Sequence, residues 1–216
     1  DVYKRQDPTL MLKRAAMAVS GPDNDEKPQP LALTLSSRQR LGLVLGAESD
    51  ARSILEAKPF LEEGLAALID AGHLDPAFRL ISRMLDTSSA ILWVLLCFDR
   101  ARGNQPEPNL QEKAARSALL EFAKKPNPGT LASAESACRF LGGTHPLALA
   151  GSGLSLALDN RLQPDGVASP FPSNLFPDLI GQAIRLISLS VPGEPRFKRI
   201  FAKELASRGV TLALAE

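Results

Sequence analysis

The chain has 216 residues, of which 44% are hydrophobic and 23% are charged, so it is long enough to bury a core. Its 25 basic residues nearly balance its 24 acidic residues, and the formal net charge is +1. A dedicated nucleic-acid-binding protein usually carries a clear basic excess, so this balance argues against a nucleic-acid partner. The longest apolar run, residues 90–98, is far shorter than the roughly 20 residues of a membrane-spanning helix, which predicts no membrane insertion.

The two cysteines, Cys97 and Cys138, lie far apart in apolar surroundings. A secreted disulfide scaffold is short and rich in cysteine, and this chain is neither. We therefore expect two separate buried thiols, with one structural disulfide as the alternative. No stretch combines a basic start with an apolar segment long enough for a secretion signal, so the expected location is the cytoplasm.

The N-terminal part of the chain shows little helical periodicity. Residues 1–30 have no sustained apolar period, and Gly21–Pro30 is polar and interrupted by prolines. This composition predicts a disordered tail over residues 1–30. The following segment, Leu31–Gly46, is ambiguous and is interpreted as a short strand or an extended segment at the edge of the domain.

From Glu48 onward the apolar residues recur at helical spacing. Pro59 is expected in the first turn of one helix, with Gly72 just past its C-terminal end. Asp75 is expected to cap the next helix, with Pro76 at its first position. The short connection between the two predicts a helical hairpin.

The segment Ala90–Arg102 is the most apolar part of the chain. Its first nine residues are apolar on all sides, which predicts a central, buried helix. The hydroxyl residues Thr87–Ser89 are expected to cap it. Trp93 and Cys97 are four positions apart and should share one buried face, with the indole N–H bonded to a backbone carbonyl or a turn.

Further helical segments follow, separated by proline and glycine. They are Leu110–Lys125, a helix capped by Thr130 that runs to Leu141, a helix from Pro146 to about Asp159, Asp178–Val191, and Pro195–Arg208, which Gly209 should end. In the last helix the apolar residues Phe197, Ile200, Phe201 and Leu205 are expected to be buried. Its basic residues should form a solvated face: Arg196, Lys198, Arg199, Lys203 and Arg208.

The predicted fold class is therefore all-α: an irregular bundle of about seven or eight helices, rich in helical hairpins. We expect a single helical domain over residues 31–216, preceded by the disordered tail.

No catalytic, cofactor-binding or metal-binding set of residues is visible in the sequence. His73 lies in a tight turn beside Asp75, where a local hydrogen bond is expected. His145 precedes Pro146 at a helix start, where capping of the helix or simple exposure is expected, and not proton transfer. Structural zinc sites usually contain paired ligands a few residues apart, whereas each histidine and cysteine here stands alone. We therefore expect no enzyme activity, no metal and no cofactor.

The segment Asn160–Pro177 is predicted to be a long loop, stiffened by four prolines. Long loops in compact domains are often binding surfaces. Its apolar residues are the candidate partner-binding residues: Val167, Phe171, Leu175 and Phe176. The alternative is that these side chains attach the loop to the bundle.

Three parts of the sequence resemble a bacterial helical family of unknown function. They are the hairpin Phe60–Leu85 followed by the tryptophan-and-cysteine helix, the stretch Ser169–Pro172, and the closing helix Phe197–Gly209. The chain departs from the family pattern in having one tryptophan where two are expected, with Leu92 at the other position. Members of that family are often encoded beside type VI secretion components, so the resemblance implies an accessory or interaction role and no reaction.

Three functions are therefore open. The first is a non-catalytic interaction protein with a protein partner, associated with a type VI secretion system. The second is a tetratricopeptide-like scaffold that binds peptides, although no second copy at the required repeat of about 34 residues is visible. The third is an enzyme that uses the loop at residues 160–177 as a lid over a helical pocket.

Overall fold

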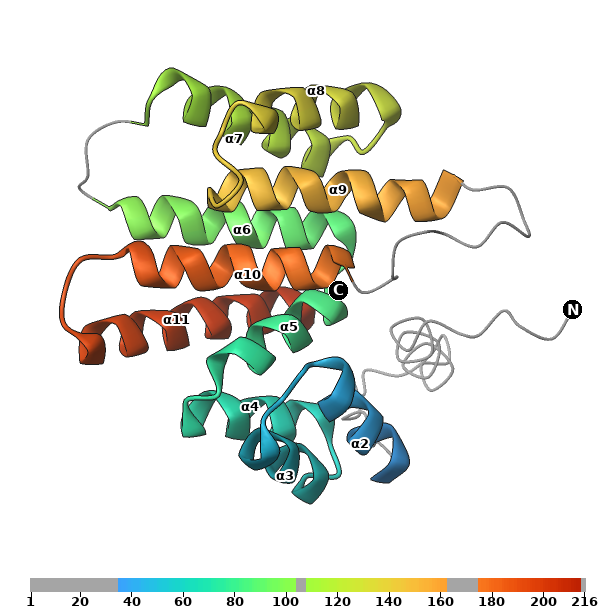
Figure 1. The fold of residues 1–216 in the computed structure, drawn as a ribbon, viewed down its shortest axis with the longest axis vertical. Coiled ribbons are helices and arrows are strands. Elements are labelled where there is room, and N and C mark those ends of the chain that lie inside the picture. Colours follow the sequence, from blue (N-terminus) through green and yellow to red (C-terminus); the bar gives the residue numbers. More distant parts are fainter. Residues whose placement is uncertain (1–34, 104–107, 163–174, 215–216) are drawn as a thin grey trace, which may run out of the picture. The chain divides into compact units, whose positions relative to one another are not determined.

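The computed structural model describes residues 35–103, 108–162 and 175–214. In this part of the chain every regular element is an α-helix, and there are ten of them (Figure 1). They are α2 (Leu35–Val44), α3 (Ser49–Ala57), α4 (Leu61–Ala71), α5 (Leu74–Met84), α6 (Thr87–Arg102), α7 (Leu110–Lys124), α8 (Pro128–Arg139), α9 (Pro146–Leu162), α10 (Leu175–Ser190) and α11 (Pro195–Leu214). The all-α class is confirmed, with more helices than the seven or eight expected. The predicted tail, residues 1–30, lies outside the described residues.

The chain divides into two compact units, one that ends at Pro76 and one that begins at Ala77. The division falls in the first turn of α5. The single domain expected over residues 31–216 stays a prediction.

In the first unit, α3 packs against both α2 and α4. The expectation of a strand or extended segment at Leu31–Gly46 is wrong for its described part, since residues 35–44 form a helix. Gly42 allows α2 to approach α3 closely, because a Cβ atom at this position would lie 2.7 Å from Cγ of Arg52. The guanidinium of Arg38 also donates to the carbonyl of Glu56 at the end of α3. Packing against α3 has therefore decided the conformation of a segment whose own pattern does not indicate a helix.

Gly72 lies just past the C-terminal end of α4, as predicted. Gly72 has φ +86°, a conformation that glycine adopts readily, and its N–H donates to the carbonyl of Ile69 at 3.2 Å. The helix starts differ from the expectation. Helix α4 begins two residues after Pro59, and α5 begins at Leu74, so that Asp75 lies in the first turn and is not the cap.

Helix α6 is the centre of the second unit, where it packs against α7, α9, α10 and α11 (Figure 1). Trp93 and Cys97 are both 0% exposed, as predicted. The Trp93 indole N–H donates to the carbonyl of Leu205 at 3.0 Å, and the Trp93 ring meets Phe78 edge-on at 6.2 Å. Both cysteines are buried free thiols, and burial raises the pKa of the Cys138 thiol to about 12.

Helices α6 and α8 begin with caps one to three residues earlier than expected. The Asp86 carboxylate accepts the Ser89 backbone N–H at 2.7 Å, so Asp86 is the cap of α6 in place of the hydroxyls that follow it. Asn127 likewise caps α8 by accepting the Thr130 N–H at 3.0 Å, and Thr130 lies in the first turn. In both cases a short side-chain acceptor stands immediately before the helix and satisfies its free N–H groups first.

The end of α11 also differs from the expectation, because the helix continues through Gly209 to Leu214. A Cβ atom at Gly209 would lie 2.6 Å from Cε2 of Trp93 and 2.7 Å from Cγ2 of Ile81. The glycine is needed for this close approach between α11 and the core, and it does not end the helix.

Candidate partner-binding site

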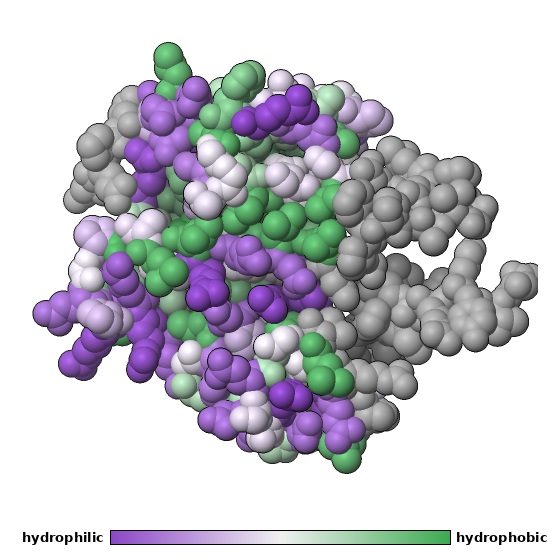
Figure 2. Space-filling model, viewed as in Figure 1, coloured by the Kyte–Doolittle hydropathy of each residue, from purple (hydrophilic) through white to green (hydrophobic). Residues whose placement is uncertain are grey.

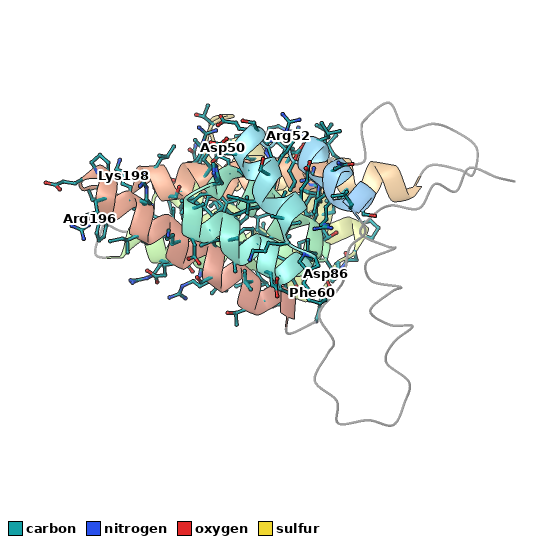
Figure 3. The ribbon with its side chains drawn as sticks, turned by 90° about the horizontal axis from the view of Figure 1, so that it is seen from below. Asp50, Arg52, Phe60, Asp86, Arg196 and Lys198 are labelled. Atoms are coloured by element: carbon teal, nitrogen blue, oxygen red, sulfur yellow. The ribbon has the colours of Figure 1, made fainter. Side chains whose placement is uncertain are left out.

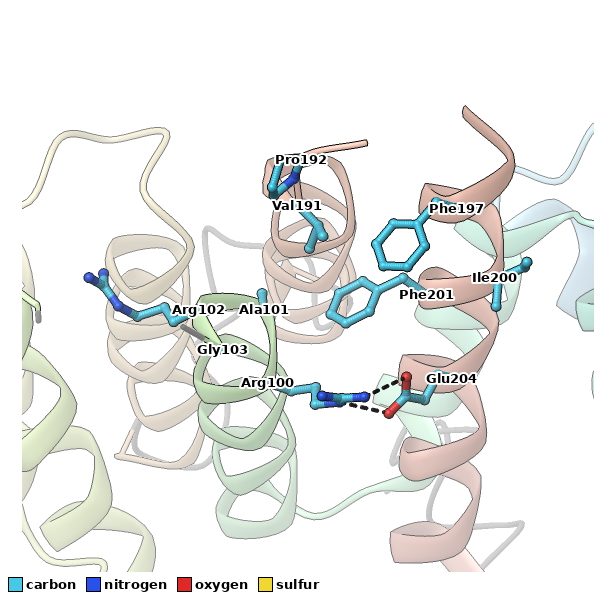
Figure 4. Close-up of a pocket in the computed structure, with 10 residues that line it drawn as sticks. All are labelled: Arg100, Ala101, Arg102, Gly103, Val191, Pro192, Phe197, Ile200, Phe201 and Glu204. Atoms are coloured by element: carbon cyan, nitrogen blue, oxygen red, sulfur yellow. Dashed lines mark hydrogen bonds and ion pairs between the residues drawn. The ribbon is translucent and has the colours of Figure 1, made fainter. Parts of the chain in front are cut away.

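An open groove lies in the second unit between the C-terminal end of α6, the turn after α10, and the first turns of α11 (Figure 4). It has a volume of about 420 Å³. Its apolar lining consists of Ala101, Val191, Pro192, Phe197, Ile200 and Phe201. We call it the α6–α11 groove.

The turn between α10 and α11 shapes one wall of the groove. Val191 is buried at the end of α10, and Gly193 has φ +130°, which favours glycine. A Cβ atom at Gly193 would lie 3.2 Å from Cδ1 of Phe197, so the glycine also leaves room for the phenyl ring. Pro195 then begins α11, as predicted.

An ion pair connects α6 to α11 at the edge of the groove. Arg100 Nε donates to Glu204 Oε1 at 2.9 Å, and Arg208 donates to the same oxygen at 3.0 Å (Figure 4 shows the Arg100 pair). The hydrogen bond from Arg100 is the largest influence on the Glu204 carboxyl, and its pKa is held below its ordinary value despite partial burial. Glu204 is therefore a neutralised anion. Because the side chains of Arg100 and Glu204 are 52% and 35% exposed, the pair adds little to stability.

The rim of the groove contradicts one prediction for α11. Phe201 and Leu205 are buried as expected, but Phe197 is 50% exposed and Ile200 is 58% exposed. The reason is geometric: the first turns of α11 lie beside the ends of α6 and α10, where fewer residues are available to cover them. Two large apolar side chains are thus left open to solvent next to a hollow. Elsewhere on the surface, the face shown in Figure 2 carries a band of hydrophobic residues between hydrophilic ones.

Basic side chains surround the same end of α11. Arg196 and Arg199 are exposed, as predicted for a solvated face. Lys198 is half-buried, and its ammonium group donates to the carbonyl of Leu189 at 2.9 Å. Figure 3 shows Arg196 and Lys198 projecting from this end of the helix.

A second group of charged side chains joins the ends of three helices in the second unit. Glu112 accepts hydrogen bonds from Arg102 at 3.0 Å and from the Asn109 backbone N–H at 3.1 Å, and it contacts His145 Nε2 at 3.1 Å. His145 Nδ1 accepts the Leu147 N–H at 3.2 Å, so the ring caps α9. With Nδ1 as the acceptor, Nε2 carries the proton that is donated to Glu112. This arrangement holds helix ends together, and the sequence did not indicate that His145 and Glu112 meet.

The pKa of Glu112 follows from these contacts. Partial burial raises it, but the hydrogen bonds from His145 and Asn109 and the charge of Arg102 together outweigh burial, and the pKa lies below its ordinary value. The carboxylate is therefore ionised at neutral pH.

Replacing Glu112 by glutamine is expected to lower the free energy of unfolding by about 1–1.5 kcal/mol at pH 7, because charge-assisted hydrogen bonds are lost. The folded-state pKa is depressed, so this contribution is present above the unfolded-state pKa of about 4.3 and disappears as the pH falls through the folded-state pKa. Urea unfolding at several pH values between 7 and 3 should show the difference between variant and wild type shrinking toward the acidic end.

The control for this experiment is Glu121→Gln. Its carboxylate is exposed and lies 3.8 Å from Lys124, so we expect a change within about 0.5 kcal/mol at every pH. A cost of Glu112→Gln that stays constant between pH 7 and pH 3 would show that charge is not the cause.

The residues predicted to bind a partner are distributed differently from the expectation. Val167 and Phe171 lie outside the described residues. Leu175 and Phe176 belong to the first turn of α10 and are half-buried, so the helix begins earlier than the predicted loop allowed. Phe176 lies against α9, since a Cβ atom at Gly153 would be 3.1 Å from Cδ2 of the Phe176 ring. These two residues are at the opposite end of α10 from Val191, a separation of about 24 Å at 1.5 Å per residue, so they do not contribute to the α6–α11 groove.

In residues 35–103, 108–162 and 175–214, no three His, Cys, Asp or Glu side chains come together in a group that could hold a metal ion. Across these same ranges, no helix is both long and apolar enough to cross a membrane.

No curated protein and no solved structure matches the chain. A family model described as a family of unknown function (DUF6931) matches residues 64–213, which include α5 to α10, most of α11 and both walls of the α6–α11 groove. The expected relation to a helical family of unknown function is thereby confirmed: this chain belongs to the DUF6931 family.

Proposed function

We propose that this chain is a non-catalytic interaction protein that binds a partner protein in the α6–α11 groove. The observation that supports this best is the exposure of Phe197 (50%) and Ile200 (58%) beside a hollow of about 420 Å³. Protein interfaces typically have such an apolar centre with a polar rim. Large apolar side chains clustered at an open surface also indicate an interaction site more often than isolated ones do.

The charged groups near the groove support a binding role over catalysis. The two ionisable side chains at its edge, Arg100 and Glu204, are hydrogen-bonded to each other. The guanidinium of Arg102 points away from the groove in Figure 4 and pairs with Glu112. Glu112 and His145 meet at the helix ends, where each serves a backbone N–H. The groups that could move a proton therefore already have structural partners.

A narrower form of the proposal is that the chain is an accessory factor of a bacterial type VI secretion system and acts in the cytoplasm. Its support is the resemblance of most of Phe60–Gly209 to a family whose members are often encoded beside such components. The partner in the groove would then be a component or regulator of that machine.

Site-specific photo-crosslinking tests the binding role. The photoreactive amino acid p-benzoylphenylalanine is placed at Ile200 in the full chain, which is expressed in the cells that encode it. Because the Ile200 side chain stands at the rim of the groove, irradiation should give one discrete adduct, whose second component is identified by mass spectrometry. The same adduct should be recovered when that second component is tagged instead.

The matched control carries the photoreactive residue at Phe140, which is 69% exposed and lies outside the groove. We expect no adduct of that size from Phe140. Equal labelling from both positions, or no discrete adduct from Ile200, would contradict the proposed function.

A further inference from the structure

We infer that the partner segment in the α6–α11 groove is acidic: a bulky apolar side chain that enters the hollow, flanked by carboxylates that face the basic residues of α11. This inference rests on the proposed function and specifies the chemistry of the occupant.

The charge of α11 is the first reason. This helix carries five basic residues and one acidic residue, whereas the whole chain is nearly balanced, with 25 basic and 24 acidic residues. The one acidic residue, Glu204, is already neutralised by Arg100 and Arg208. The groove therefore lies in a locally positive field, and complementary charge on a partner favours encounter and orientation.

Two of the basic groups are available to a partner. Arg196 and Arg199 are exposed and have no ion-pair partner among the described residues. Around a helix with about 100° per residue, Arg196 lies about 40° from Ile200, and Arg199 lies about 60° further on the same side. A segment that contacts Ile200 therefore passes Arg196 first, and Arg199 is the next basic side chain beyond it. Arginine binds carboxylates through two parallel hydrogen bonds, which suits it to recognising Asp and Glu.

The shape of the site favours a protein segment over a membrane surface. A helix that lies on a membrane presents one continuous apolar face to the lipid. In α11 most of that face is used in the core, because Phe201, Leu205 and Gly209 are buried. What remains open is a hollow with two apolar residues on one side and the Val191–Pro192 turn on the other. A hollow of this kind accepts a side chain inserted from a partner.

The test uses the purified full chain and a phage-displayed library of random 12-residue peptides. Enriched peptides are sequenced, and the most frequent one is synthesised with a fluorescent label for anisotropy titrations at low and high salt. We expect enriched peptides with more Asp and Glu than Lys and Arg, and with at least one Leu, Ile, Phe or Trp. Their affinity should fall with added salt, since exposed charges are screened.

Two double variants with the same change in charge test where the peptide binds. Arg196→Glu/Arg199→Glu should weaken the peptide at least tenfold. Lys125→Glu/Arg139→Glu, which alters exposed residues at the ends of α7 and α8, should leave the affinity within about twofold. Ile200→Asp should also abolish binding. Circular dichroism and thermal unfolding confirm that each variant is folded.

The other possible results contradict the inference, and comparison with the crosslinking experiment shows whether the proposed function fails with it. Neutral or basic enriched peptides, or an acidic peptide that binds Arg196→Glu/Arg199→Glu normally, would show that the charge assignment is wrong. If no peptide is enriched while Ile200 still gives its crosslink, the acidic-segment inference fails and the proposed function stands. If no peptide is enriched and Ile200 gives no crosslink, both the inference and the proposed function are wrong. Phosphatidylglycerol vesicles are tested in parallel. If the chain binds these vesicles, loses that binding in Ile200→Asp and enriches no peptide, the groove binds an anionic membrane and the inference is wrong.

Discussion

The Trp93→Ala variant is expected to lose about 3–5 kcal/mol of unfolding free energy, because alanine leaves a cavity that the surrounding helices cannot close. The indole is 0% exposed, its ring packs edge-on against Phe78 at 6.2 Å, and its N–H donates to the Leu205 carbonyl at 3.0 Å. For a chain of this size each kcal/mol is worth about 2–4 °C, so the thermal midpoint should fall by about 10 °C. Urea unfolding followed by circular dichroism measures the difference.

Leu96→Ala is the matched control on the same helix. Leu96 is 45% exposed, so its truncation should cost no more than about 1 kcal/mol. If Trp93→Ala were no more destabilising than Leu96→Ala, the indole would not be the centre of the second unit's core.

Gly209→Ala should lower the free energy of unfolding by about 1–2 kcal/mol, although alanine is the better helix former by about 1 kcal/mol. The steric effect opposes this gain and is larger. The added Cβ would lie 2.6 Å from Cε2 of Trp93 and 2.7 Å from Cγ2 of Ile81, and both of these side chains are 0% exposed. Neither can move into solvent, and overpacking of this kind costs about 1–3 kcal/mol and sometimes more.

A double-mutant cycle identifies the cause. In a Trp93→Phe background the smaller ring leaves space for the new methyl group, so Gly209→Ala should cost clearly less than in the wild type. Gly142→Ala is the control, because no atom lies within 4 Å of a Cβ at that position, and its effect should be small. Additive costs of Gly209→Ala and Trp93→Phe would mean that the two residues do not compete for the same space.

The contacts of Trp93 and Gly209 also position one wall of the groove. The hydrogen bond from Trp93 to Leu205 and the close approach at Gly209 hold α11 against the rest of the second unit, and the first turns of α11 form one wall of the groove. A change at Gly209 is therefore expected to weaken partner capture at Ile200 even though it is two turns or more away. Arg196→Glu/Arg199→Glu and Ile200→Asp should leave the free energy of unfolding nearly unchanged, because the side chains they replace are exposed.

Much of the fold could be predicted from local patterns. Helical periodicity, proline and glycine indicated the all-α class, the span of α7 and the turn at Gly72 because these signals act over a few residues. The long apolar run predicted that Trp93 and Cys97 are buried in a central helix, since no other environment could accommodate it in water. The place of His145 before Pro146 left capping and exposure open, and the structure shows the cap.

Only the tertiary structure decided the features that depend on residues distant in sequence. In the sequence Gly209 resembles a helix terminator, whereas in the structure Trp93 and Ile81 pack against it within the helix. Phe197 and Ile200 share the apolar period of the buried Phe201, yet they are exposed because α6 and α10 end beside them. Periodicity reports which face of a helix is apolar, but not how far its neighbours extend along it. By itself the sequence thus determined the helices and the centre of the core, whereas the α6–α11 groove exists because three helix ends meet.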